Sequence, residues 1–403
     1  MTGNLGRFFA AALLIAAAPA RLHAEEPAQG IDPSLIIEQF DVFNDGDLLL
    51  VPVTAFGKTR TFVFDTGCAI MLYDKSLRPF LGKPRKSVIG STPQGKVTVE
   101  MFDSPKTLLG KLSLHTEQPV GCVDLRQMSQ LSGHDIAGFV GISMLQHYVV
   151  QIDFDAGKLA FLKQVPEHAG ERFEFTWLNG GVPAIQAEMS GFGSELFLID
   201  TGFLSHDAGK LNPETAATLT AHNLAEAKEL RTYSRDLSGT IVQKLLSIKG
   251  LRLGSHRMFD VPMSTGEPKK PSMLSLGLLS RFIVTFDFPN RAIYLKKGKQ
   301  FDRPFRLALG GIIFVRKGGD VVVEAVREDR PAAKAGIKVK DVLKVGEQET
   351  SGARLFKLYD EFRSPGQIVR VKLMRGDQII EADVKLPDED DKDSADKPQD
   401  AGS

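Results

Sequence analysis

Two copies of the tripeptide Asp-Thr-Gly are the residues of this chain best suited to chemistry, and each copy ends an apolar run. They occupy positions 65–67 and 200–202, so the two aspartates lie 135 positions apart (200 − 65). Two carboxylates that face each other cannot both ionise, so they share a proton and can act together as acid and base. We therefore expect Asp65 and Asp200 to form a pair that activates water for hydrolysis.

The other residues of each tripeptide have physical roles of their own. The hydroxyls of Thr66 and Thr201 can hydrogen-bond to the backbone and fix the loop. Gly67 and Gly202 allow a tight turn, which brings backbone N–H groups close to the carboxylate. These four residues are therefore expected to support the two active loops.

The sequence around the tripeptides repeats at a nearly constant offset. Asp65 lies 76 positions before Gly141, and Asp200 lies 77 before Gly277, while Asp153 and Asp287 are 134 apart. Equal internal distances of this kind predict a duplicated unit. The elements that end in the two glycines are expected to pack behind the active loops.

Short apolar runs flanked by turn-forming residues predict β-strands in both copies. The first copy has them at 48–53 and 61–64, with a hairpin turn at Gly57-Lys58, and closes with strands at 148–154 and 158–162. The second copy closes with strands at 282–288 and 292–295.

On these residues the chain resembles the aspartic peptidases of the pepsin and retropepsin clan, over positions 35–298. The resemblance implies a β-barrel lobe at 35–165, a second at 170–298, and a cleft between them on a pseudo-two-fold axis. It also implies flaps with tips at 91–96 and 238–240, and neither tip carries a flap tyrosine. It implies that Asp65 and Asp200 are the catalytic pair of a peptidase that acts on peptides or proteins without a metal or other cofactor. Lobes that pair within one chain predict a monomer; separate dimerisation of each lobe with another chain is the alternative.

The residues that follow the two tripeptides depart from the family pattern, in which a small residue is common. Here Cys68 follows the first copy and Phe203 the second, where a phenylalanine could crowd the loop or narrow a subsite. A catalytically silent peptide-binding or scaffolding protein on the same fold therefore stays open. Cys68 and Cys122 could form a disulfide, or Cys68 could be a buried free thiol beside the site.

A third unit follows, with strand-like runs at 311–315, 320–326, 341–345, 368–374 and 379–386 and a helix from Ser351 to Phe362. Residues 330–343 and 369–376 resemble the PDZ domain of the bacterial type, here covering 305–386. The resemblance implies that the loop of Leu309, Gly310, Gly311 and Ile312 receives the C-terminal carboxylate of a bound peptide. The alternative is a packing module that binds nothing. The expected fold class is thus mainly β: two tandem acid-protease-like β-barrel lobes followed by a PDZ domain.

The two ends of the chain predict export and a solvated tail. Arg7 precedes an apolar run at 8–18 with small residues after it, as in a signal peptide (1–24) cut after Ala20 or Ala24. The expected location is therefore periplasmic or secreted, the alternative being an uncleaved membrane-surface segment. No later stretch is long and apolar enough to span a bilayer. Positions 387–403 are acidic, lack large apolar residues, and are expected to be disordered.

Overall composition argues against some classes of partner. Fifty basic and fifty acidic residues leave no formal net charge, so nucleic-acid binding is not expected. His134, Asp135 and His147 have no further ligand at a useful spacing, and surface positions are expected for them rather than a metal site.

Overall fold

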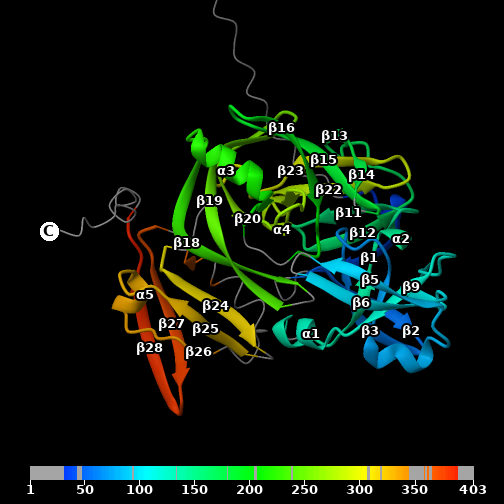
Figure 1. Ribbon diagram of the computed structural model, residues 1–403, viewed down its shortest axis with the longest axis horizontal. Helices are drawn as coiled ribbons and strands as arrows, with labels where there is room; N and C mark the ends of the chain where they lie inside the picture. Colours follow the sequence, from blue (N-terminus) through cyan, green and yellow to red (C-terminus); the bar gives the residue numbers. More distant parts are fainter. Residues whose placement is uncertain are drawn as a thin grey trace, which may run out of the picture.

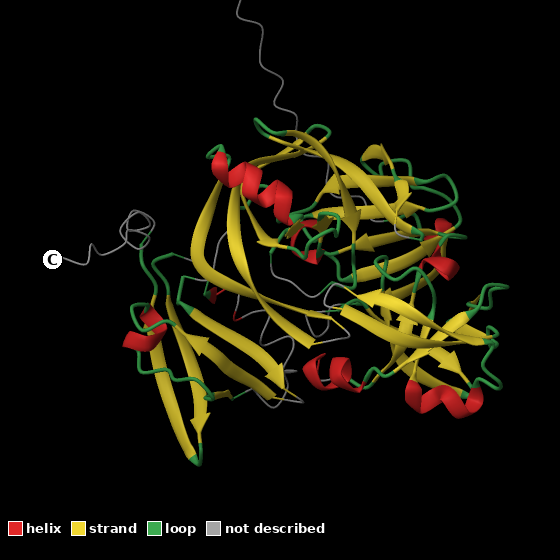
Figure 2. Ribbon diagram, in the orientation of Figure 1, coloured by secondary structure: helices red, strands yellow, loops and turns green. Residues whose placement is uncertain are grey.

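The computed structural model describes residues 31–42, 48–92, 95–132, 134–178, 180–203, 207–236, 239–305, 309–317, 320–344, 358, 361–362 and 365–388. The expected mainly β composition is confirmed, since strands dominate these residues and the helices are few and short (Figure 2). The predicted signal peptide at 1–24, the tail from 389 and most of the helix expected from Ser351 lie outside the described residues.

Residues 35–165, here called lobe 1, contain a nine-stranded sheet in the order β5-β6-β9-β4-β10-β3-β2-β7-β8 (Figure 1). A 3₁₀ helix (η2, Lys75–Phe80) and two short helices, α1 (Arg126–Ser132) and α2 (Ile142–Leu145), accompany it. The strands of the lobe are β1 (Ile36–Asp41), β2 (Leu50–Ala55), β3 (Lys58–Phe64), β4 (Leu72–Asp74), β5 (Lys86–Thr92), β6 (Gly95–Phe102), β7 (Thr107–Leu109), β8 (Leu112–Ser113), β9 (Val120–Val123), β10 (Ile136–Val140), β11 (Val149–Asp153) and β12 (Lys158–Leu162).

Residues 170–298, here called lobe 2, contain an eight-stranded sheet in the order β14-β15-β16-β21-β17-β20-β19-β18. Its helices are α3 (Pro213–Ala221) and α4 (Leu276–Leu279). The strands are β13 (Glu171–Glu174), β14 (Thr176–Leu178), β15 (Val182–Met189), β16 (Gly193–Ile199), β17 (Gly209–Leu211), β18 (Ala225–Asp236), β19 (Gly239–Leu253), β20 (His256–Thr265), β21 (Met273–Leu274), β22 (Phe282–Asp287) and β23 (Ala292–Lys297).

The two lobes follow the same strand order. Strands β5, β6, β9, β4, β10, β3 and β2 of lobe 1 correspond in turn to β18, β19, β20, β17, β21, β16 and β15 of lobe 2. The local differences are insertions and breaks: α1 lies between β9 and β10, whereas the described connection between β20 and β21 carries no helix. The sequence repeat is therefore matched by a repeat of connectivity.

A third sheet joins the lobes within the chain, in the order β1-β12-β11-β22-β23-β13. At its centre β11 pairs antiparallel with β22, and Gln151 lies directly opposite Thr285. These two residues are 134 positions apart, and the Gln151 amide donates to the Thr285 hydroxyl at 2.8 Å. Because this is the offset of the repeat itself, the pair lies on the pseudo-two-fold axis that relates the lobes.

Apolar side chains form one large core that draws residues from both lobes, with a smaller cluster on the outer side of each sheet. The cluster in lobe 1 contains Leu125, Met128 and Phe139, with Cys68 and Ile70 packed against it. Its counterpart in lobe 2 is smaller and includes Phe203 and Met273. The lobes therefore share a centre but have separate outer layers.

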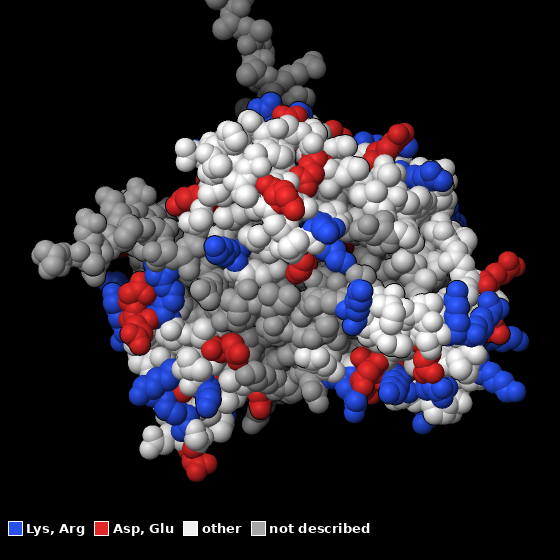
Figure 3. All heavy atoms as spheres, in the orientation of Figure 1, with Lys and Arg blue, Asp and Glu red and all other residues white. Residues whose placement is uncertain are grey.

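The C-terminal unit has a core of its own, formed under a five-stranded sheet in the order β24-β25-β26-β27-β28. Its elements are β24 (Ile312–Lys317), β25 (Asp320–Val326), α5 (Pro331–Lys334), β26 (Val342–Leu343), β27 (Ile368–Arg375) and β28 (Gln378–Lys385). Among the described strands, β24 pairs only with β25 and so forms an edge. Basic and acidic side chains are interspersed over the face drawn in Figure 3, in keeping with the balanced composition.

Candidate active site

Each Asp-Thr-Gly loop begins where a strand of one lobe ends beside a parallel neighbour. Strand β3 runs parallel to β10, and β16 runs parallel to β21. The Asp65 N–H donates to the Val140 carbonyl at 3.1 Å, and the Asp200 N–H donates to the Leu274 carbonyl at 3.0 Å. The two aspartates are therefore placed by equivalent bonds at equivalent strand ends.

These bonds correct one prediction from the sequence, the pairing of Gly141 with Gly277. Val140 and Leu274 are equivalent, so the partner of Gly141 is Ser275, and each precedes a short helix as its N-cap. Gly277 instead lies inside α4. The interval from Asp200 did not separate Ser275 from Gly277, because these positions are only two residues apart. A side chain at Gly141 would meet the Ile70 carbonyl at 2.3 Å, which explains the glycine in lobe 1.

The two threonines bind across the lobe boundary in a reciprocal pattern. The Thr66 N–H donates to the Thr201 hydroxyl at 3.0 Å, and the Thr201 N–H donates to the Thr66 hydroxyl at 3.1 Å. Each hydroxyl then donates to a strand of the opposite lobe: Thr66 to the Ile199 carbonyl and Thr201 to the Phe64 carbonyl. Four buried bonds therefore lock the loops together, so the threonines fix each other's loop as well as their own.

The two glycines show that the carboxylates face each other. A methyl group built on Gly67 would lie 2.4 Å from Cγ of Asp200, and one built on Gly202 would lie 2.2 Å from Cγ of Asp65. Each carboxylate also accepts the N–H of its own glycine, at 2.7 Å for Asp65 and 3.0 Å for Asp200. Glycine is thus required at both positions because the opposite carboxylate occupies the space of a side chain.

The pair is electrostatically uneven. Asp65 is buried, with 8% of its surface exposed, whereas Asp200 is partly exposed. Burial, and then repulsion by the Asp200 carboxylate, hold the pKa of Asp65 well above its ordinary value, against opposing backbone hydrogen bonds. Asp65 is therefore suited to hold a proton that the pair shares.

Cys68 and Phe203 occupy different surroundings. The Cys68 thiol donates to the Ile70 carbonyl at 3.0 Å, and both cysteines are free, so the disulfide alternative is not realised here. Burial, and then the negative charge of Asp65, raise the pKa of this thiol well above its ordinary value. Phe203 is buried in the outer cluster of lobe 2 with Leu198 and Met273. Its ring therefore packs into the apolar cluster of lobe 2.

A buried lysine beneath Phe203 escaped the sequence analysis. Lys210, on β17, places its ammonium 4.6 Å from the centre of the Phe203 ring and 3.3 Å from Glu267. Gln243 donates to the same carboxylate at 3.4 Å. The strand signal of β17 is only three residues long, so nothing local in the sequence marked Lys210 as buried.

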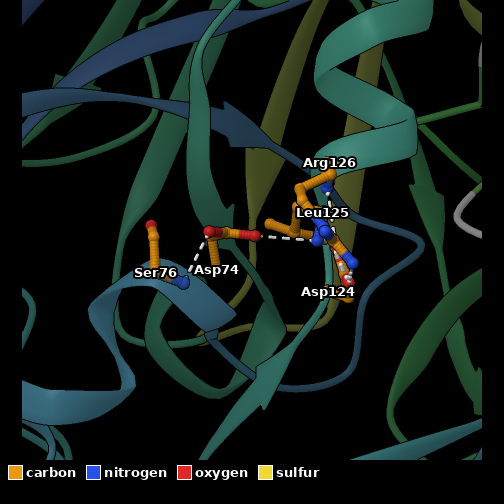
Figure 4. Close-up of polar contacts among 5 residues, drawn as sticks. All are labelled: Asp74, Ser76, Asp124, Leu125 and Arg126. Carbon is orange, nitrogen blue, oxygen red and sulfur yellow. Dashed lines mark hydrogen bonds and ion pairs between the residues drawn. The ribbon is translucent and has the colours of Figure 1, made fainter.

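Asp74 is a second residue that the sequence did not single out, and it organises the support of the lobe 1 loop (Figure 4). Its carboxylate accepts the Ser76 N–H at 2.7 Å, which caps η2, and the Leu125 N–H at 2.8 Å, directly before α1. Because β4 follows the active loop in the chain, this buried carboxylate ties the loop's exit to the start of α1.

Two hairpins occupy the positions expected for flaps. Strands β5 and β6 pair up to Thr92 and Gly95, and β18 and β19 pair up to Asp236 and Gly239. The tips at 93–94 and 237–238 lie outside the described residues, which include parts of both predicted flap tips. The hairpin of lobe 2 is the longer, so the two sides of the site are unequal.

The predicted carboxylate loop of the C-terminal unit leads into the edge strand β24. Leu309 donates its N–H to the Phe362 carbonyl at 2.9 Å, while the carbonyls of Gly310 and Gly311 accept from Ala332 and Arg327. Gly311 has a φ of +65°, and a side chain there would collide with Arg330 at 2.2 Å. Ile312 is buried and opens β24. The loop is therefore held by the N–H of Leu309 and by the carbonyls of Gly310 and Gly311.

The described residues contain no group of three or more His, Cys, Asp or Glu side chains arranged to hold a metal ion. None of the helices in these same parts of the chain is long and apolar enough to cross a membrane. His134 is partly exposed and Asp135 is exposed.

Comparison with known proteins identifies the C-terminal unit. The family model of the PDZ domain matches residues 309–386. The expected PDZ domain is therefore confirmed over these residues, and such domains bind peptides. A comparison with curated proteins finds no match to the chain.

Proposed function

We propose that the chain is an exported aspartic endopeptidase in which Asp65 and Asp200 activate water, with a PDZ domain that binds peptide termini. The observation that carries the proposal is the reciprocal bonding of Thr66 and Thr201 around two facing carboxylates. Two facing carboxylates repel each other and so destabilise the fold. A loop with only a structural role would therefore not be expected to bring them together.

The chemistry follows from the uneven pair. Asp200, ionised, takes a proton from water as the oxygen attacks the carbonyl carbon of the peptide bond. Asp65, protonated, donates a hydrogen bond to the carbonyl oxygen and stabilises the negative charge that develops there. The tetrahedral intermediate then collapses: the C–N bond breaks, and the amine leaves with a proton returned by the pair. Thr66 and Thr201 keep the carboxylates at a fixed separation throughout.

The joint sheet supports a dyad that forms within one chain. Strands β11 and β22 pair along their whole length, and the Gln151–Thr285 bond marks the axis between the lobes. We therefore propose a monomer, exported to the periplasm or secreted. The PDZ domain would bind the tails of protein substrates and bring them to the cleft.

A silent scaffolding protein on the same fold is the competing function, and Phe203 was its main support. The burial of Phe203 within lobe 2 removes the expected crowding of the loop. Retention of glycine at both collision points with the carboxylates further favours a working pair. Two observations remain on the competing side: neither predicted flap tip, 91–96 or 238–240, carries a tyrosine, and the PDZ domain itself binds peptides without cleaving them.

Digestion of a diverse peptide library between acidic and neutral pH tests the proposal, with mass spectrometry of the products. We expect cleavage by the natural chain and none by the double variant D65N/D200N, which keeps the shape of both side chains. Cleavage that survives in the double variant, or a natural chain inactive at every pH, would contradict the proposal.

A further inference from the structure

The edge strand of the PDZ domain lies against lobe 1. Helix α1 of lobe 1 contacts β24, and Figure 1 shows the arrowhead of β24 directed toward it. The end of β24 nearest α1 is therefore the end at Lys317, away from the carboxylate loop.

A peptide bound to this edge has a defined direction. Its terminal carboxylate is received at Gly310 and Gly311, directly before β24 begins. The preceding residues of the peptide must then run along β24 toward Lys317, antiparallel to the strand. Strand β24 has six residues, or about 20 Å at the usual rise, so a seventh peptide residue reaches α1.

Helix α1 is built as a fixed surface. Asp74 holds the Leu125 N–H before the helix, and the Ser129 hydroxyl accepts the Ile136 N–H at 3.1 Å, which ties α1 to β10. Met128 is buried in the outer cluster of lobe 1, while Arg126 and Gln127 are exposed. Such a helix presents polar side chains without having to fold on binding.

We propose that the peptide site of the PDZ domain continues onto α1, so that protein C-terminal tails of seven or more residues contact both units. The tail ends in a free carboxylate at the loop before β24, and the buried side chains of Ile312, Leu358 and Phe362 support this end of the strand from the core. Its upstream residues lie beside α1, whose exposed residues include Gln127 and Arg126, the latter paired with Asp124. Lobe 2 has no described helix at the equivalent position, so the contact with α1 is a feature of lobe 1.

The contact has a consequence for the candidate active site. Met128 of α1 and Cys68, which follows the Asp-Thr-Gly of lobe 1, belong to the same apolar cluster. A tail bound on α1 therefore contacts an element that shares an apolar cluster with the loop of Asp65. The binding itself does not depend on catalysis.

The test uses the full chain carrying D65N and D200N, so that no peptide is cleaved. Fluorescence anisotropy compares a tetrapeptide and an octapeptide that end in the same four residues, with valine last and a free carboxylate. We expect the octapeptide to bind about tenfold more tightly, and R126A/Q127A to remove most of that gain while leaving the tetrapeptide unchanged. The matched control is E214A/T218A, two exposed residues of α3, which should change neither affinity.

A second measurement locates the contact. An octapeptide with a benzophenone side chain at its second residue, seventh from the C-terminus, should cross-link to residues 124–136 on illumination. Equal affinity for the two lengths, a cross-link confined to other segments, or no binding of either peptide would overturn the proposal. Because every arm uses the inactive chain, none of these results bears on the proposed peptidase activity.

Discussion

Lobes 1 and 2 share the frame of the candidate site but differ immediately beyond it. Both place an aspartate at the end of a parallel strand pair, and in both a threonine of the other lobe bonds to the backbone on either side of that aspartate. After the tripeptides, lobe 1 has a partly exposed Cys68 beneath α1, whereas lobe 2 has a buried Phe203 above Lys210. The difference shows that symmetry is maintained where the lobes meet and not where each loop meets its own lobe.

The largest effect on the free energy of unfolding should come from Phe203 and Cys68, the residues that differ between the two loops. Phe203→Ala removes a buried ring and should lower the free energy of unfolding by about 3–4 kcal/mol, measured by urea denaturation. Cys68→Ala removes one partly exposed sulfur atom and should cost less than about 1.5 kcal/mol. Phe203→Leu serves as the control that keeps most of the apolar volume. Equal losses for F203A and C68A would show that the two loops are supported alike.

The next largest effect, on kcat/KM, should come from Gly67 and Gly202, the glycines that the two loops share. Gly67→Ala pushes against Asp200, and Gly202→Ala pushes against Asp65, so each change misplaces the carboxylate of the opposite lobe. We expect either variant to lower kcat/KM by about a hundredfold. Cys68→Ala, next to Gly67, removes a thiol that donates to the Ile70 carbonyl and not to a carboxylate, so it is the control and should keep most of the activity. A hundredfold loss for only one of the two variants would mean that only one carboxylate depends on the glycine of the opposite lobe for its position.

The sequence anticipated the paired aspartates because the same apolar run and tripeptide recur, and a repeat is visible without any knowledge of space. It also anticipated most strands at their observed positions, including 320–326, which coincides with β25. It could not show that Gly67 faces Asp200, because that approach depends on how the lobes dock. The error over Gly277 has a similar origin: spacing alone cannot separate two alignments that differ by two residues.

The supports of the loops were missed for a different reason. Asp74 and Lys210 belong to short strands, and each matters through a partner far away in the chain, Leu125 and Glu267 respectively. Helix α1 is only seven residues long and has no periodic pattern that would distinguish it from a loop. Short elements held by long-range contacts are therefore the part of this site that the sequence does not reveal.

A smaller effect should come from the titration of Asp65, seen in how stability changes with pH. Because the pKa of Asp65 is raised, the folded chain keeps a proton that the unfolded chain loses above about pH 4, so stability falls as pH rises through that region. Asp65→Asn removes this titration, and its unfolding free energy should fall less between pH 4 and 7 than that of the natural chain. The exposed Asp260, changed to asparagine, controls for the loss of one charge. Parallel pH curves for D65N and the natural chain would contradict the burial argument.

The most direct test of a dyad built from one aspartate of each lobe is hydrolysis by D65N, by D200N and by an equimolar mixture of the two chains. If the dyad forms within one chain, each variant is inactive and the mixture is inactive as well. Activity in either single variant would mean that like lobes of different chains pair, since one natural pair would then survive. Activity that appears only in the mixture would mean that lobe 1 of one chain works with lobe 2 of another, and it would contradict the account.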